Sequence, residues 1–319
     1  MQSKIPTIKN IINAYNKIKP FINKTPVLTS TNINKILQCK LYFKCENFQK
    51  TGAFKFRGAC NAVLSFDEHK IKNGFATHSS GNHAAALSLA AKLRKTNAYI
   101  AIPDNAPKIK TDAVLEYGGK IFYCKPSLEA REEKLKEIIY QTNATFIHSY
   151  NNFNVISGQG TVAYELFNEI PELDIVIAPV GGGGLLSGTS IVMKSLKKNI
   201  IVFGAEPKNA DDAYQSLIAK KIIPSNNPKT IADGLLTSLC PLTFKIILNN
   251  VEQIITVNEN SIILCMKMIL ERMKIIIEPS AAVAVAAILE NPSIFKNKSV
   301  GVIISGGNVE LSKLPFFDN

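Results

Sequence analysis

No two cysteines of the 319-residue chain have the C-x-x-C spacing of a redox or zinc motif. The six cysteines are scattered, as expected of reduced thiols in a cytoplasmic protein, at positions 39, 45, 60, 124, 240 and 265. No apolar run is long enough to cross a membrane, because the longest, 281–289, has about half the length that a span needs. Residues 1–24 lack the apolar segment of a secretory signal, so we expect neither secretion nor membrane insertion.

A basic run interleaved with aromatic residues is also lacking, although the net charge is +12. The lysines are scattered among asparagine and isoleucine, which favours a solvated surface over a nucleic-acid partner and still allows attraction of small anions. Apolar residues make up 46% of the chain, enough for a large core, and the length exceeds that of one ordinary compact unit. We therefore expect two lobes.

Short apolar runs alternate with helical patterns from residue 41 onward. Strands are expected at 41–45, 75–77, 99–102, 120–123, 145–147, 174–180, 200–205, 253–256 and 300–304. Helices are expected at 8–18, 59–66, 83–94, 107–117, 128–141, 157–169, 184–197, 210–220, 259–273 and 279–289. This alternation predicts an α/β fold with mostly parallel sheets covered by helices.

Lys55 lies between two phenylalanines, close to the start of the expected helix at 59–66. The N–H groups and dipole of a helix start lower the pKa of a nearby amine, and so does loss of solvation beside apolar rings. Both effects activate a lysine that forms a Schiff base. The ordinary alternative is a lysine whose stem crosses an apolar surface into solvent. The triplet alone favours that alternative, and the rest of the chain reverses the preference.

Residues 77–84 form a polar turn between an expected strand and an expected helix. Ser79, Gly81 and Asn82 favour outward-pointing N–H groups, which suit a carboxylate or a phosphate. The ordinary alternative is a capping turn with Ser80 or Asn82 at the helix N-cap.

A second glycine-rich turn follows the strongest expected strand, ends at Leu185 and contains Gly181, Gly182, Gly183 and Gly184. Four glycines let the backbone wrap an anion, most simply a phosphate. The turn is neither a strict G-x-G-x-x-G motif nor a P-loop. Residues 158–163 do fit G-x-G-x-x-A, but they follow a poor strand, so we interpret them as the start of a helix.

Two further turns carry polar groups after expected strands. Glu206 and Asp212, with a backbone carbonyl between them, could hold a hard divalent cation, whereas the ordinary alternative makes Asn209 a helix cap. Ser305 ends the last strand, at the edge where α/β sheets bind ligands.

Together and in this order, these motifs resemble the fold-type II pyridoxal phosphate enzymes of the serine/threonine dehydratase family, most of all its serine racemases. The similarity covers residues 25–310, and its longest motifs are 48–52, 77–83, 157–161, 179–184, 206–212 and 305–309. It implies a two-lobed fold like that of tryptophan synthase β. Residues 1–75 and 151–319 would form the large domain, residues 76–150 a small mobile domain, and two chains a homodimer.

The resemblance also implies roles for single residues. Lys55 would form the Schiff base with pyridoxal phosphate, Phe54 would lie beside its ring, and Ser305 would meet the pyridine nitrogen. A serine there leaves that nitrogen neutral, which makes the ring a weaker electron sink. Asn82 would bond the 3-hydroxyl, and residues 181–185 would hold the phosphate. The substrate would be bound by Ser79, Ser80, Gly81, Asn82, His83, Arg131 and Thr237.

Ser80 decides between the reactions that the resemblance allows. Racemisation needs an acid and a base on opposite faces of the substrate, and Lys55 and Ser80 would supply them. We therefore expect racemisation of L-serine, with accompanying dehydration of serine to pyruvate and ammonia. Alternatives are a threonine/serine or 3-hydroxyaspartate dehydratase, or an aspartate racemase. A non-catalytic ligand-binding regulator is disfavoured, because Lys55, Ser305 and the four glycines are all present.

The resemblance extends to a metal and a nucleotide. It implies that Glu206, Ala210 and Asp212 form a site for Mg²⁺, Ca²⁺ or Mn²⁺. It also implies an activating ATP at a dimer interface, bound by Ser30, Thr31, Lys50, Thr51, Tyr117, Arg272 and Asn308. Departures from the family pattern occur at Asn32, Ala53, Ala84 and Ala85. The run 148–150, His-Ser-Tyr, replaces His-Pro-Asn near the cofactor, which could alter side-chain specificity.

Overall fold

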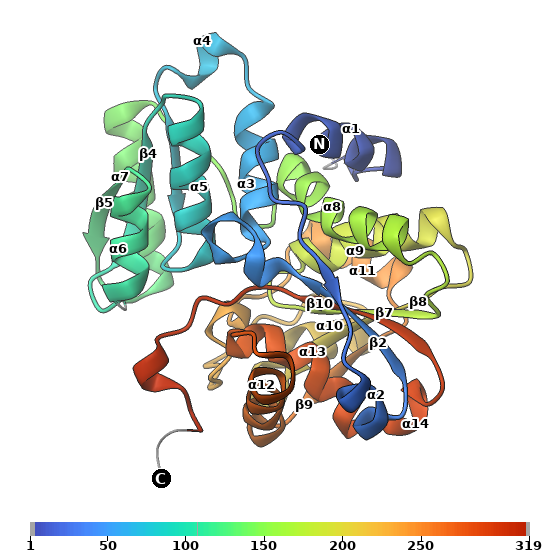
Figure 1. The fold of residues 1–319 in the computed structure, drawn as a ribbon. Coiled ribbons are helices and arrows are strands. Elements are labelled where there is room, and N and C mark those ends of the chain that lie inside the picture. Colours follow the sequence, from blue (N-terminus) through green and yellow to red (C-terminus); the bar gives the residue numbers. More distant parts are fainter. Residues whose placement is uncertain (1–3, 107, 317–319) are drawn as a thin grey trace.

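The computed structural model describes residues 4–106 and 108–316, which form two sheets covered by helices (Figure 1). The larger sheet has the order β1 (Val27–Leu28), β2 (Lys40–Cys45), β10 (Ser299–Ile304), β7 (Ile175–Pro179), β8 (Ile201–Pro207) and β9 (Gln253–Val257). The smaller has the order β5 (Gly119–Cys124), β4 (Ala98–Pro103), β3 (Phe75–His78) and β6 (Thr145–Phe146). All of these strand pairs are parallel except β1 with β2. The α/β fold class is therefore confirmed.

The helices divide between the two sheets. Those of the smaller sheet are α5 (Asn82–Leu93), α6 (Lys108–Glu116) and α7 (Leu128–Thr142). The others are α1 (Ile8–Ile18), α2 (Thr31–Leu37), α3 (Lys55–Leu64), α4 (Glu68–Ile71), α8 (Phe153–Glu169), α9 (Gly184–Leu196), α10 (Asp212–Ala219), α11 (Pro241–Asn250), α12 (Glu259–Met273), α13 (Pro279–Glu290) and α14 (Pro292–Phe295). Short 3₁₀ turns lie at Glu46–Phe48, Lys50–Gly52, Lys208–Ala210, Asp233–Leu235 and Leu311–Lys313.

Both faces of the larger sheet are buried. In β7, Ile175 and Ile177 join the core shared with α12 and α13, whereas Val176 and Ala178 join the core shared with α8 and α9. A strand with two buried faces has no polar face, which is why its sequence is a continuous apolar run. The longest apolar run of the chain is α13, whose residues from Ser280 to Ile288 are all buried. Among the described residues, no helix is long and apolar enough to span a membrane.

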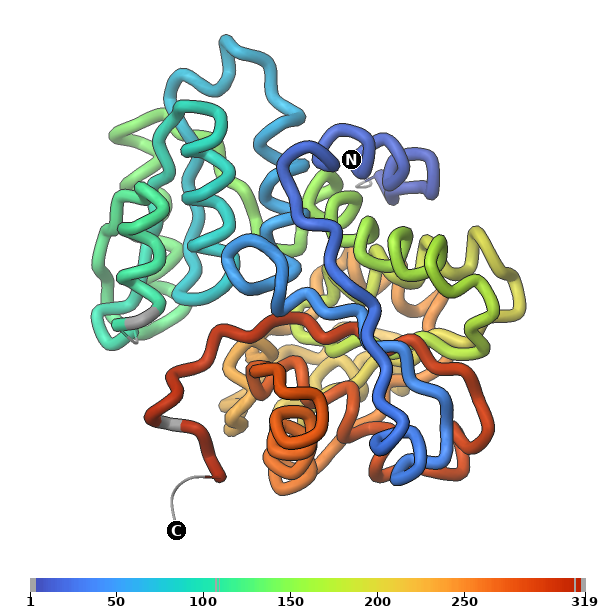
Figure 2. Tube along the Cα trace, viewed as in Figure 1, coloured from blue at the N-terminus to red at the C-terminus, as the bar shows by residue number. Residues whose placement is uncertain are grey.

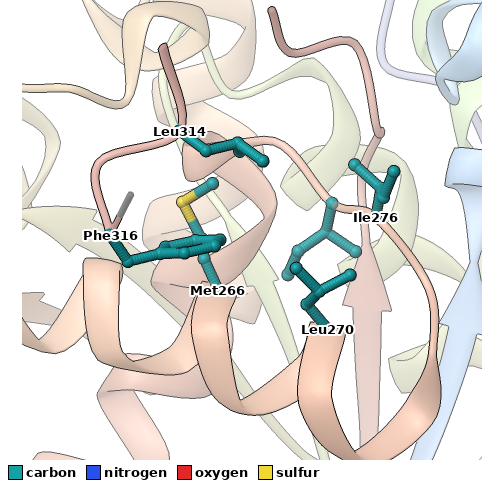
Figure 3. A pocket seen from close by; sticks show the side chains of 6 residues that line it. Met266, Leu270, Ile276, Leu314 and Phe316 are labelled. Carbon is teal, nitrogen blue, oxygen red and sulfur yellow. The ribbon is translucent and has the colours of Figure 1, made fainter. Parts of the chain in front are cut away.

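Strands from the N-terminal and C-terminal parts of the chain pair in the larger sheet. Figure 2 shows the blue N-terminal part and the red C-terminal part side by side, where β2 pairs with β10 from Lys40–Ser299 to Cys45–Ile304. After β10 the chain returns to α12, where Leu314 and Phe316 help to line a small apolar pocket (Figure 3). Its lining contains no ionisable group.

All nine expected strands are present, and their ends differ from the expected ones by at most two residues. The expected helix at 107–117 corresponds to α6, and its first residue lies outside the described residues. Four helices were not predicted, namely α2, α4, α11 and α14, and each has ten residues or fewer. Their weak periodicity explains the omission.

Two helix starts were predicted four residues too late, and glycines explain both. The helix expected at 59–66 is α3, which begins at Lys55. The helix expected at 157–169 is α8, which begins at Phe153, so 158–163 lie inside a helix and do not start one. Gly58 and Gly158 lie where the two helices touch, because a Cβ on Gly158 would stand 2.5 Å from the Arg57 carbonyl oxygen. These glycines permit close helix packing rather than a turn.

Candidate active site

Lys55 is fixed in place by an extension of β10. The Phe54 N–H donates to the carbonyl of Ser305 at 3.0 Å, and the Gly307 N–H donates to the carbonyl of Gly52 at 2.9 Å. Ala53 and Gly306 form an antiparallel bridge between these contacts. Lys55 then opens α3, which packs between α5 of the smaller sheet and α8 of the larger one (Figure 1). The lysine thus lies between the two sheets, one residue beyond the backbone partner of Ser305.

A buried network of charged side chains connects α3 to α8 and to the end of β2. Arg57 pairs with Glu46 at 2.7 Å and with Glu165 of α8 at 2.8 Å, and Lys44 of β2 pairs with Glu165 at 2.7 Å. These four side chains are at most 2% exposed. Burial alone would raise the pKa of Glu165, but bonds and charges from Arg57 and Lys44 hold it below the ordinary value. Two cations compensate two anions, so the network can be buried without an unpaired charge.

The Lys55 amine is half-buried and donates a hydrogen bond to the carbonyl of Ser149 at 3.4 Å. It also lies 5.2 Å from the centre of the Phe54 ring. Burial lowers the pKa of Lys55 to about 8, and the negative charge of Glu278 offsets part of that change. The amine is therefore closer to its neutral, nucleophilic form at neutral pH than an exposed lysine is.

Glu278 was not predicted as a site residue. It is buried, and both of its carboxylate oxygens accept from the side-chain amide of Asn82 at 3.0 Å. Asn308 completes the arrangement by donating to the Asn82 side-chain oxygen at 2.9 Å and to the Thr51 carbonyl at 2.7 Å. Burial raises the pKa of Glu278 to about 7. The available signal was an acidic residue directly before Pro279 and the longest apolar run.

The turn after β3 is open on one side. Ser79 and Ser80 are half-buried, and a Cβ on Gly81 would meet no atom within 4 Å. Asn82 begins α5 and carries the contact to Glu278. His83 is buried instead, with its Nε2 3.1 Å from the Ile147 carbonyl. Its side chain is thus engaged by the core, whereas Ser79 to Asn82 border free space.

The tetraglycine turn, residues 181–184, lies against Tyr150. A Cβ on Gly182 would stand 2.3 Å from the Tyr150 ring, so only glycine fits there. Gly183 has φ +83°, a left-handed conformation that favours glycine, and Gly184 begins α9. Burial raises the pKa of Tyr150 to about 12, and a hydrogen bond with the exposed Thr237 partly counters that rise. Lys55 and this turn therefore meet at Ser149–Tyr150.

Arg131 belongs to the same region. Its charge lowers the pKa of His78, although burial contributes more, and it also acts on Tyr150. Arg131 lies in α7 and His78 ends β3, so both belong to the smaller sheet. Thr237, in the loop before α11, thus bonds to Tyr150, and the charge of Arg131 from α7 acts on the same residue.

Glu206 and Asp212 are both buried, at 0% and 5% exposure. Glu206 accepts from the N–H groups of Ala213 and Tyr214 at 3.1 and 2.9 Å, so it caps α10, and Asn209 does not. Both carboxylate oxygens of Asp212 are buried and lack a well-aligned hydrogen bond among the described residues, although the Ser225 hydroxyl partly offsets the rise in the pKa of Asp212. Burial raises the pKa of both carboxyls, that of Asp212 to about 6. No cluster of three or more His, Cys, Asp or Glu suited to a metal occurs in residues 4–106 and 108–316.

The seven residues expected to bind a nucleotide are only partly assembled. Thr51 and Asn308 are bonded to each other, and Lys50 precedes Thr51. Ser30 caps α2 ahead of Thr31, Tyr117 follows α6, and Arg272 lies in the last turn of α12. Within the described parts of this single chain, no hydrogen bond or ion pair joins Ser30, Thr31, Tyr117 or Arg272 to the others.

Known proteins are similar to this chain over nearly its whole length. A serine racemase of Dictyostelium discoideum is 51% identical over 97% of this chain and 96% of that protein. A beta-hydroxyaspartate dehydratase of Paracoccus denitrificans is 47% identical over 98% of this chain and 99% of that protein. The crystal structure of the Dictyostelium serine racemase superposes with a TM-score of 0.91, at 52% identity, over 96% of this chain and 99% of that one. The family profile "Pyridoxal-phosphate dependent enzyme" matches residues 18–306, and the chain belongs to that family.

Proposed function

We propose that this enzyme racemises L-serine to D-serine and also eliminates water from serine, releasing pyruvate and ammonia. The observation that carries the proposal is the half-buried Lys55 amine with its lowered pKa, held between the sheets that carry Ser80 and Ser305. The 51% identity to a serine racemase supports the choice of reaction within the family.

Bound pyridoxal phosphate supplies an electron-accepting ring that acidifies the Cα–H bond of an attached amino acid. Lys55 would carry the cofactor, with Phe54 beside the ring and Ser305 at its nitrogen. Asn82 would bond the 3-hydroxyl, and the N–H groups of residues 181–185 would hold the phosphate. The fit rests on the open space beside Gly81, the glycine-only contact at Gly182 and the helix start at Gly184.

The chain's own residues would then exchange the proton on the α-carbon of the substrate. One of Lys55 and Ser80 takes the Cα proton from one face, and the other returns a proton on the opposite face, which inverts the centre. The turn from Ser79 to His83 would bind the substrate carboxylate through its N–H groups. Arg131 and Thr237 would lie beside the substrate side chain. Loss of the β-hydroxyl after proton removal would give the elimination product.

Replacing Ser80 tests the two-face assignment. Ser80→Ala should abolish D-serine formation and retain pyruvate release, because only inversion needs an acid–base group on the second face. Both products are measured on cofactor-loaded protein, by chiral chromatography and a coupled pyruvate assay. The neighbouring Ser79→Ala serves as a matched variant. Equal loss of both products in Ser80→Ala would contradict the assignment.

We also propose a divalent cation, Mg²⁺, Ca²⁺ or Mn²⁺, between Glu206, Asp212 and the Ala210 carbonyl. Two neighbouring buried carboxylates whose charges repel each other are costly unless a cation compensates them. At 100 times its Kd, Mg²⁺ should add about 3 kcal/mol of stability, or about 4 °C in Tm for a chain of this length. Asp212→Asn keeps the Glu206 cap and should lose this response. An unchanged Mg²⁺ response in Asp212→Asn would exclude the site.

The proposal also covers domain organisation, dimerisation, nucleotide binding and location in the cell. Residues 76–150 would form a small domain that moves against residues 1–75 and 151–319. The strands of the smaller sheet lie within 75–146, so all of their residues except Phe75 fall in the proposed small domain, which supports this division. Residues 1–3, 107 and 317–319 of the proposed domains lie outside the described residues. We further propose a homodimer with ATP as an activator at the seven nucleotide residues. The six cysteines are unpaired, which suits the reducing cytoplasm.

A second candidate is the dehydration of 3-hydroxyaspartate. The relative of that activity is 47% identical, and the positive charge of Arg131 near Tyr150 would suit a second carboxylate. A product assay on L-serine, D-serine, L-threonine, L-aspartate and 3-hydroxyaspartate separates the two candidates. A kcat/KM for 3-hydroxyaspartate well above that for L-serine would favour the second.

A further inference from the structure

His148 follows the smaller sheet and is held by an unusual pair of contacts. Its ring nitrogen Nδ1 accepts from the backbone N–H groups of Tyr150 at 3.3 Å and Asn151 at 3.0 Å. Because a backbone N–H can only donate, Nδ1 must present its lone pair, and the ring proton must be on Nε2. The loop therefore fixes His148 as one tautomer, with a hydrogen-bond donor at Nε2.

The ring is also fixed in direction by an aromatic cluster. Its centre lies 4.5 Å from that of Tyr150, 5.6 Å from Phe146 and 6.2 Å from His78. The next residue, Ser149, holds the Lys55 amine. Among the described residues, Nε2 of His148 has no hydrogen-bond partner. A donor with a fixed tautomer thus lies one residue away from the carbonyl that accepts from the Lys55 amine.

His148 also stays neutral over the working pH range. Burial, together with the charges of His78 and Lys55, lowers the pKa of His148 to about 4. A neutral ring whose Nδ1 is already occupied offers one donor and no acceptor. Such a group favours a substrate with an oxygen to receive that hydrogen, and a substrate lacking the oxygen leaves the donor unpaired.

We propose that His148 is a specificity-determining residue whose Nε2–H donates to an oxygen of the group attached to the β-carbon of the substrate. This inference rests on the proposed function and specifies its substrate class: amino acids with a β-hydroxyl or a β-carboxylate. Serine, threonine and 3-hydroxyaspartate qualify, whereas alanine and the β-ammonium of 2,3-diaminopropionate do not.

The alternative is that His148 only caps the loop through Nδ1. His148→Asn separates the two roles, because an asparagine oxygen can accept the same two N–H groups and has no donor at the Nε2 position. Asn152 already makes this type of cap, accepting from the N–H groups of Asn154 and Val155 at 2.9 and 3.0 Å. His148→Gln is the reciprocal variant, since its longer amide can place a donor near the Nε2 position.

The experiment measures Kd values of the cofactor-loaded protein for L-serine and L-alanine, from the first change in cofactor absorbance after rapid mixing. One lost hydrogen bond of about 1.4 kcal/mol corresponds to tenfold. In His148→Asn, the preference for L-serine over L-alanine should fall about tenfold with the L-alanine Kd unchanged, and His148→Gln should retain part of it. Equal weakening of both ligands in His148→Asn, no change in either, or a lost preference in His148→Gln would overturn the proposal. A wild type that binds neither amino acid would overturn the proposed function as well.

Discussion

Replacing Lys55 by methionine should stabilise the cofactor-free protein. The pKa of Lys55 falls from an ordinary 10.5 to about 8, so the folded state holds the ammonium less favourably than the unfolded chain does. At about 1.4 kcal/mol per pKa unit, the difference is about 3 to 4 kcal/mol at neutral pH. The side chain is only half-buried, and solvent screening should reduce the measurable gain to about 2 kcal/mol. For a chain of this length, that gain is about 3 °C in Tm.

The sign of the pH dependence is fixed by the direction of the shift. Because the folded-state pKa is depressed, the penalty is full below pH 8, shrinks as the pH rises and vanishes near pH 10.5. The stability advantage of Lys55→Met should therefore be smaller at pH 9.5 than at pH 7. Urea unfolding of both proteins without cofactor at these two pH values measures it. Pyridoxal phosphate should then raise the Tm of the wild type more than that of the variant.

An exposed lysine provides the control for this experiment. Lys198 lies just beyond α9 in solvent, and Lys198→Met should change stability by less than about 0.5 kcal/mol at either pH. If Lys55→Met is no more stable than the wild type at pH 7, or if its advantage does not shrink at alkaline pH, then the amine is not desolvated. The argument for its reactivity would fail with that result.

Two further substitutions test how Lys55 and the tetraglycine turn are held. Arg57→Leu should lower the free energy of unfolding in urea by about 3–5 kcal/mol, because Glu46 and Glu165 would stay buried without their cation. As a control, Lys134→Met, in an exposed pair with Glu137, should lower it by less than about 1 kcal/mol. A small cost for Arg57→Leu would mean that water reaches the network. Gly182→Ala should weaken binding of the cofactor, measured by absorbance, because its Cβ would meet the Tyr150 ring. Tyr150→Ala in the same chain should restore binding. Failure of Tyr150→Ala to restore binding would refute the steric explanation.

Patterns within about ten residues of the chain predicted the secondary structure well. The strands were predictable because burial of both faces, as in β7, leaves a short continuous apolar run, and its length and the turn residues beside it distinguish it from a helix. The starts of α3 and α8 were not predictable, because Gly58 and Gly158 are typical of turns when only the local sequence is considered. Their role depends on two helices that touch across about 100 residues of chain. Local propensity was overridden there by tertiary packing.

The candidate site was predictable where glycine and polar turns follow strands, as at Ser79–Asn82 and Gly181–Gly184. Glu278 was not, since its bond to Asn82 spans 196 positions, and no short motif contains both residues. The Lys55–Ser149 contact spans 94 positions and is equally invisible in a local pattern. Long-range pairing is known only when the fold is known, whereas strand ends collect at one edge of a parallel sheet in any such fold.

The desolvation of Lys55 has a different origin from the one that its neighbours in sequence indicated. Successive residues of a helix point in different directions, so two flanking phenylalanines cannot both cover the same amine. Phe54 lies 5.2 Å from the amine, but Phe56 is fully buried in the core shared with α5. Ser149, which another element brings in, contacts the amine, whereas the charge of Glu278 opposes the effect of burial on the Lys55 pKa. The same burial that lowers the pKa of Lys55 raises that of Glu278, so both shifts favour the uncharged forms at the centre of the site. The reactivity of the lysine is therefore a property of the assembled interface between two sheets, and a peptide containing the F-K-F triplet would not reproduce it.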